Sequence, residues 1–198
     1  MKKWFKLLTS ILLVFSLTAC GENGTDEGKN KDTEEVHENH DQDDKVKESE
    51  IGKLTVVKQK KDLNQTIKSG PMNITITSIQ AATLQPNDEY KEAFFDNKDE
   101  VTIVTIAMKV ENTSEDTISI YPNQAALTTN TGEQVDADML LSDDIGGEFF
   151  GKVNKEGDVI FQLDAPADEI TKVKYIVDGA HDTDYNSLSD QIQVDLEF

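Results

Sequence analysis

Hydrophobic and polar residues follow three different patterns along the 198-residue chain. Residues 7–17 are mainly apolar, residues 21–50 are almost entirely polar, and residues 51–198 alternate between the two over short stretches. We therefore divide the chain into three segments and expect each to have a different structure.

The alternation is clearest in residues 100–112, where every second residue is apolar. This is the period of a strand with one buried face. Its inward positions are Val104, Ile106, Met108 and Val110. Residues 112–116 contain turn-forming residues and residues 117–121 resume the alternation, so we predict a hairpin between these two strands.

Six further stretches are short, alternating and rich in β-branched residues. They are residues 72–81, 125–129, 134–137, 158–163, 171–177 and 191–198. Residues 130–132 and 154–157 have the composition of turns, and residues 84–99 form a polar excursion with room for one helical turn. Seven or eight short strands with almost no helical periodicity predict an all-β domain, an antiparallel β-sandwich.

The first twenty residues have the layout of a secretory signal. Three lysines precede an apolar run, and small residues precede Cys20, the only cysteine. The run is about half of the roughly 20 residues that span a bilayer. Residues 17–20, Leu-Thr-Ala-Cys, resemble the lipobox of bacterial lipoprotein signal peptides. The alternatives are an ordinary signal peptide with a free cysteine and a core cysteine.

The lipobox resemblance implies that Cys20 is lipidated and becomes the first residue after cleavage. Two acyl chains on one residue give stable membrane anchoring. We therefore expect a protein on the extracellular side of the cell membrane of a Gram-positive bacterium, with residues 1–19 removed.

Residues 21–50 contain only two aliphatic side chains, Val36 and Val46. Such a segment buries too little apolar surface to offset the entropy of ordering, so we expect a disordered acidic tether. The domain prediction is then residues 20–50 for the lipidated cysteine and linker, and residues 51–198 for the sandwich.

Charge excludes some classes of partner. The net charge is −20 and the chain has no arginine. Because phosphate and nucleic-acid recognition rely on arginine forks and basic patches, we expect no nucleic-acid partner and no docking on an anionic membrane surface.

Two clusters have the residue types of metal ligands. His37 and His40 lie in the tether among carboxylates, a composition suited to Zn²⁺. Asp182, Asp184 and Asn186 place oxygen atoms at alternate positions of a loop, a pattern suited to Ca²⁺. The alternatives are a solvated spacer and a polar turn, because Ser187 replaces the glycine of a calcium loop.

Residues 51–198 contain no cysteine and one histidine, His181, in a segment with loop composition. Nucleophilic catalysis needs a nucleophile, a base and a group that orients the base. We therefore predict no catalytic residues, a non-enzymatic protein, and no cofactor other than weakly bound calcium or zinc.

Two pairs of adjacent aromatic residues are candidates for a contact surface: Phe94 with Phe95, and Phe149 with Phe150. In a strand only one of two neighbours points inward, so the other is exposed, and exposed aromatic residues often form contact sites. The alternative is that loops at the ends of the sandwich use them to close the core.

The order of the alternating residues in 104–132 resembles an Ig-like domain of unknown function found in Gram-positive surface lipoproteins, with the immunoprotective extracellular antigen fold. Gly157, the strand after it and Pro166 resemble the same family, whereas residues 149–151 depart from its pattern. The resemblance covers roughly residues 72–196 and implies an Ig-like fold without catalytic residues. We expect a surface lipoprotein that binds a protein, a wall polymer or a small ligand; the alternative is divalent-metal capture.

Overall fold

The computed structural model describes residues 45–198, which form twelve strands and one short α-helix. All strand pairings are antiparallel, as predicted. The strands are β1 (Val46–Glu48), β2 (Gly52–Lys60), β3 (Gln65–Ser69), β4 (Met72–Pro86), β5 (Val101–Asn112), β6 (Thr117–Ile120), β7 (Ala126–Thr129), β8 (Gln134–Asp136), β9 (Gly147–Phe150), β10 (Asn154–Leu163), β11 (Lys172–Val177) and β12 (Ile192–Glu197). The helix is α1 (Asp88–Phe94), and a 3-10 turn, η2 (Pro122–Gln124), precedes β7.

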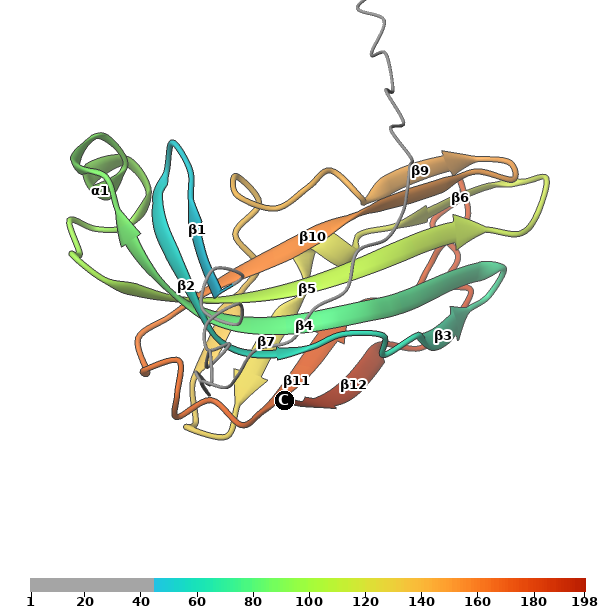
Figure 1. Ribbon diagram of the computed structural model, residues 1–198. Coiled ribbons are helices and arrows are strands. Elements are labelled where there is room, and N and C mark those ends of the chain that lie inside the picture. Colours follow the sequence, from blue (N-terminus) through green and yellow to red (C-terminus); the bar gives the residue numbers. More distant parts are fainter. Residues whose placement is uncertain (1–44) are drawn as a thin grey trace, which may run out of the picture. The chain divides into compact units, whose positions relative to one another are not determined.

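The strands form two layers (Figure 1). The first is a sheet in the order β1-β2-β4-β5-β10, with β3 beside β4. The second layer combines the sheet β12-β11-β7-β8 with the pair β6-β9. The main hydrophobic core lies between the layers and takes side chains from both, so the all-β sandwich prediction is confirmed.

A bulge in β4 determines which side chains face the core. Register against β5 shifts between Ile76 and Ser78, so Thr77 is an extra residue. Before the bulge the even-numbered residues are buried in the main core, and after it Ile79 and Ala81 take that position. The following even-numbered residues, including Gln80, therefore turn to the outer face of the sheet.

The predicted hairpin between residues 100–112 and 117–121 is wrong. Both edges of β5 are occupied by β4 and β10, and β6 pairs with β9 in the other layer. The buried side chain of Asn112 fixes this crossover by donating from Nδ2 to the carbonyl oxygens of Asp116 and Phe149, at 2.7 and 3.2 Å.

The predicted turn at residues 154–157 is also wrong, since these residues are the first part of β10. Gly157 permits this path because a Cβ there would lie 2.6 Å from Cβ of Asp143. The hairpin around residues 130–132 is confirmed by the pairing of β7 with β8. The polar excursion contains α1, as predicted.

The described sheet begins at Val46, five residues before the boundary predicted from composition, because residues 46–48 pair with β2 as β1. The described residues, 45–198, belong to one compact unit that contains both hydrophobic clusters. The signal segment, Cys20, His37 and His40 lie outside the described residues. Within residues 45–198 no helix is long and apolar enough to cross a membrane.

Candidate ligand-binding groove

A groove of about 320 Å³ lies on the outer face of the first sheet, on the side away from the main core. Small-molecule sites typically have volumes of about 300 Å³ or more. Its floor is built from β2, β4, β5 and β10, and its walls from the β1–β2 hairpin, the residue after α1 and the loop between β8 and β9. The lining residues are Lys47, Ser49, Ile51, Leu54, Gln59, Ser78, Gln80, Leu84, Phe95, Ile103, Thr105, Ala107, Leu141, Asp158 and Ile160.

Strand register arranges the floor in rows that cross the sheet. One row contains Ser78, Ala107 and Asp158, and is polar at both ends. The next contains Gln59, Gln80, Thr105 and Ile160. The row after that brings Ile103 beside Ala82. The groove therefore changes from polar to apolar along the strand direction.

The apolar end of the groove belongs to a second hydrophobic cluster. Its buried members are Leu84, Phe95, Val101 and Ile103. Phe95 is 1% exposed, and Leu141 and Ile160 are only partly buried because the groove opens between them. The cluster exists because the β4 bulge and the alternation of β5 place apolar residues on both faces of this sheet.

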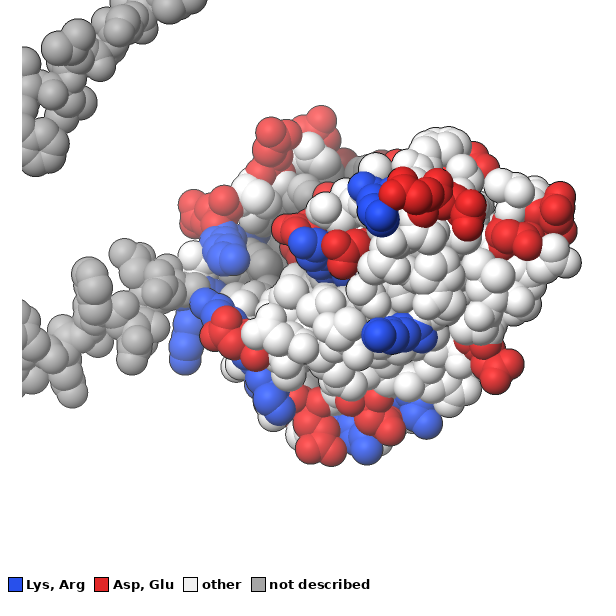
Figure 2. Space-filling view, turned by 90° about the vertical axis from the view of Figure 1, so that its right-hand side faces the viewer, with Lys and Arg blue, Asp and Glu red and all other residues white. Residues whose placement is uncertain are grey.

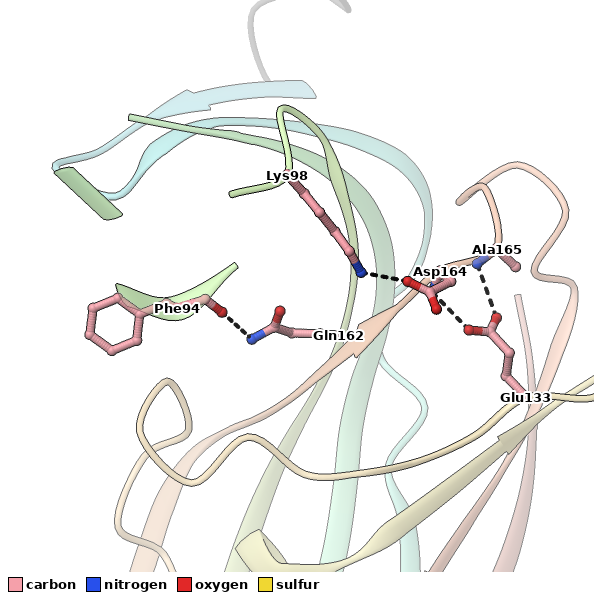
Figure 3. Close-up of polar contacts among 6 residues, drawn as sticks. All are labelled: Phe94, Lys98, Glu133, Gln162, Asp164 and Ala165. Atoms are coloured by element: carbon pink, nitrogen blue, oxygen red, sulfur yellow. Dashed lines mark hydrogen bonds and ion pairs between the residues drawn. The ribbon is translucent and has the colours of Figure 1, made fainter. Parts of the chain in front are cut away.

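Polar contacts hold the walls at this end (Figure 3). The side-chain amide of Gln162 donates to the carbonyl oxygen of Phe94, at 3.1 Å. The same amide donates to Oδ2 of Asp138, at 2.7 Å. Figure 3 also shows Lys98 beside Asp164, whose backbone N–H donates to Glu133. These contacts join the segment after α1, the end of β10 and the β7–β8 hairpin.

Hydrogen bonds attach the β1–β2 hairpin to the start of α1. The N–H of Asn87 donates to the carbonyl oxygen of Ile51 at 2.8 Å, and its Nδ2 donates to that of Glu50 at 2.7 Å. The hairpin and α1 lie at the same end of the molecule (Figure 1). The first residues of the domain thus form a fixed wall of the groove.

Asp158 is the acidic group that lines the polar end, and it remains accessible to solvent. Its backbone N–H donates to Oδ2 of Asp143 at 2.8 Å. Burial raises the pKa of Asp158 above its ordinary value, the Asp143 carboxylate raises it further, and Lys47 lowers it. Beside it, Nε2 of Gln59 donates to Oε1 of Gln80, which is 8% exposed.

The aromatic pairs have different outcomes. Phe149 is the inward residue of its pair: it is fully buried and closes the main core, which is the alternative to a contact role for this side chain. Phe95 is buried but lines the groove, and Phe94 is partly buried beside it. Phe150 is 69% exposed and stays a candidate contact residue.

His181 was expected to be a simple loop residue, but it pairs with Ser119 of β6 through two backbone hydrogen bonds of 2.9 and 3.0 Å. Its ring stacks between Tyr121 and Tyr185, with centroid distances of 6.0 and 5.2 Å. No sequence period relates these three residues, so pattern analysis could not find the stack. Figure 2 shows the end of the molecule that carries β3, β6 and β9, where a mostly uncharged area is interrupted by a basic side chain and bordered by acidic and basic side chains.

The predicted calcium loop is held by its own hydrogen bonds. Oδ1 of Asp182 accepts from the N–H groups of Asp184 and Asn186, and Oδ2 accepts from Nδ2 of Asn186, all within 2.9 Å. Asn186 therefore uses its amide as a donor to Asp182, which supports the polar-turn alternative. Within residues 45–198 no three His, Cys, Asp or Glu side chains are arranged to hold a metal ion.

Comparison with known proteins places the chain in a family. The model of the family described as "Domain of unknown function (DUF4352)" matches residues 61–190. The chain belongs to this family. The match covers the part of the floor built from β4, β5 and β10, but it begins after β2 and so leaves out the β1–β2 hairpin.

Two relatives come from Bacillus subtilis (strain 168). The SPbeta prophage-derived uncharacterized lipoprotein YonS is 26% identical over 134 residues, covering 66% of this chain and 60% of YonS. The uncharacterized protein YdhF is 24% identical over 161 residues, covering 72% of this chain and 67% of YdhF. The chain thus spans less than two thirds of the length of YonS.

A solved structure supports the fold. The crystal structure of a functionally unknown protein from Listeria monocytogenes EGD-e superposes with a TM-score of 0.56 at 14% identity, covering 74% of this chain and 88% of that one. At this identity the similarity concerns the fold alone.

Proposed function

We propose that this DUF4352 protein is a non-enzymatic lipoprotein, anchored through Cys20 to the extracellular side of a Gram-positive cell membrane, that binds a small ligand in the groove. The observation that carries the binding proposal is the groove itself, in which an apolar end and a polar end share one sheet face. Such a combination suits a ligand with an apolar body and a polar group.

The anchoring proposal rests on the lipobox-like residues 17–20 and on the name of the relative YonS, a lipoprotein. The Ig-like class of the sandwich is part of the same proposal and is supported by the two antiparallel layers and the residue pattern of 104–132. The proposal requires no cofactor and no nucleic-acid partner.

Binding without catalysis is supported by the groove lining. Its ionisable side chains are Asp158 and Lys47, and the other polar side chains are amides and hydroxyls. Histidine, the common general base, is represented within residues 45–198 by His181, whose ring lies in the tyrosine stack and not in the groove.

Anchoring is tested by metabolic labelling of cells with an alkyne-bearing fatty acid, followed by fractionation. We expect the unaltered chain to carry the label and sediment with membranes, and Cys20→Ser to lose both properties. Thr25→Ser, a conservative change five residues away, should behave like the unaltered chain. A labelled, membrane-bound Cys20→Ser chain would contradict the proposal.

Binding is tested by screening small molecules with ligand-observed NMR against residues 21–198, which include the whole compact unit. Ala107→Leu places a larger side chain in the floor of the groove, and Ala126→Leu makes the same change on β7 in the other layer. We expect ligands that bind the unaltered protein to be lost from Ala107→Leu and retained by Ala126→Leu. Ligands retained by both variants would place binding elsewhere.

A further inference from the structure

We infer that the ligand of the groove is a small organic cation with an apolar body, whose ammonium group lies beside Asp158. This inference rests on the proposed function, because it identifies the chemical class that the same groove accepts. It is carried by the unpaired carboxylate, the surrounding charges and the spacing of the polar and apolar rows.

The Asp158 carboxylate has no partner within the part of the chain that the structure describes. Its backbone N–H is paired with Asp143, but no N–H, hydroxyl or ammonium group of residues 45–198 donates to its side chain. Burial and the neighbouring Asp143 carboxylate raise its pKa, and the charge of Lys47 offsets this only in part. A ligand cation would supply the missing partner.

The charges around Asp158 also favour a cation. Asp158 and Lys47 line the groove, and the Asp143 carboxylate lies next to Asp158 outside the lining, so two carboxylates act on this end against one ammonium group. Further along the same strands, Lys109 and Glu156 form a pair of 3.5 Å and largely cancel each other. The net charge of −20 adds a long-range attraction for cations.

The length of the ligand follows from the strand register. Ala107, in the row of Asp158, and Ile103, in the apolar row, are four residues apart on β5, which corresponds to about 13 Å. A volume of about 320 Å³ is at the lower end for ligand sites, so it suits a ring with a short alkyl amine and not a long-chain lipid.

Three probes with the same apolar body test the inference: 3-phenylpropylamine, 3-phenylpropanol and 3-phenylpropionate. Each is titrated into ¹⁵N-labelled residues 21–198 at low salt, and backbone amide shifts of the groove residues give the site and the dissociation constant. We expect the amine to bind about fivefold tighter than the alcohol and the carboxylate to bind weakest, as one solvent-exposed ion pair would give.

Variants assign the preference to Asp158. In Asp158→Asn the amine should lose its advantage over the alcohol, whereas alcohol binding should be unchanged. Asp195→Asn removes a carboxylate from the outer face of β12 and should leave the ratio as it was. Amide spectra of both variants verify that the fold is intact.

The outcomes separate this inference from the proposed function. Equal binding of amine and alcohol in the groove would overturn the cation preference and leave the groove as a ligand site. If none of the probes shifts groove residues, both this inference and small-ligand binding in the groove are contradicted.

Discussion

The hydroxyl group of Tyr175 donates a 2.7 Å hydrogen bond to the carbonyl oxygen of Pro122, in the interior of the sandwich. Tyr175 is fully buried in β11, and its ring meets Phe161 of β10 edge-on with centroids 6.5 Å apart. Burial raises the pKa of the Tyr175 hydroxyl far above its ordinary value, so the group remains a donor. This one side chain contacts both layers.

Removing that hydroxyl should destabilise the domain without changing its packing. Tyr175→Phe leaves the carbonyl oxygen of Pro122 buried and without its partner, which typically costs about 1–3 kcal/mol. Urea unfolding of residues 21–198 measures the change. Tyr185→Phe, at a position 83% exposed, should change stability by less than about 0.5 kcal/mol. Equal effects of the two variants would show that the Tyr175 bond adds nothing.

Asn112 should be among the most sensitive polar positions. It is 1% exposed, donates to Asp116 and Phe149, and accepts from the N–H and hydroxyl of Ser114 at 2.9 and 2.8 Å. Asn112→Ala removes the partner of the buried Phe149 carbonyl and of three partly buried groups, so we expect a loss of about 2–4 kcal/mol by urea unfolding. The exposed Asn154 supplies the control, since Asn154→Ala should be nearly neutral. A loss below about 1 kcal/mol at Asn112 would refute its role at the crossover.

Gly52 allows the β1–β2 hairpin to lie close to the end of β4. A Cβ at this position would lie 2.2 Å from the carbonyl oxygen of Gln85 and 2.7 Å from Cα of Pro86, both backbone atoms. Gly52→Ala should therefore cost about 2 kcal/mol or more and shift amide signals along the groove wall. Gly132 has a positive φ of +90°, but no atom lies within 4 Å of a Cβ added there. Gly132→Ala therefore measures the cost of the positive φ without a steric clash, about 1–2 kcal/mol. Undisturbed groove signals in Gly52→Ala would argue against this contact.

The Asp182 loop should loosen in acid. Hydrogen bonds from the Asn186 side chain and from backbone N–H groups lower the pKa of Asp182 below its ordinary value of 3.8. Because the pKa is lowered in the folded state, the Asp182 carboxylate stabilises the loop at pH values above its ordinary pKa. This contribution is lost as the pH falls through the lowered pKa. Amide exchange of Asn186 and Tyr185 should therefore accelerate below about pH 3.8, relative to the rest of the domain.

Two variants test the assignment to Asp182. Asp182→Ala should show fast exchange already at neutral pH, because the acceptor is absent at every pH. Asp184→Asn should keep the acid response, because the Asp184 side chain is not an acceptor in this loop. An unchanged response in Asp182→Ala would assign the acid sensitivity to another group.

Alternation predicted eight of the strands because each has one face in the main core. It did not predict β1, β2, β3 or β9, whose residues are largely exposed or only partly buried. It also missed that β6 pairs with β9, since period alone does not select a partner. The family resemblance began at residue 72, so it did not include the hairpin that forms a wall of the groove.

The groove could not be predicted from local patterns. Gln59, Gln80 and Thr105 lie in one row only because of the pairing register and the β4 bulge, which shifts inward and outward positions by one residue. Phe95, a member of one aromatic pair, indicated this region, but no local pattern indicated that Asp158 lies in the same site. Among the many carboxylates of the chain, only the fold distinguishes one that lies in a groove without a partner.

The wall formed by β1 has a mechanical consequence. β1 joins β2 through three paired residues, and the chain enters this hairpin at its open end, at the pair Val46–Thr55. If the chain is anchored at Cys20, tension on the tether breaks these pairs one after another, beginning at Val46. A strand pulled along its own axis would instead resist with all its pairs at once. Stretching the attachment would thus unzip β1 before any other strand, withdraw Lys47 and Ser49 from the bound molecule, and couple ligand release to load.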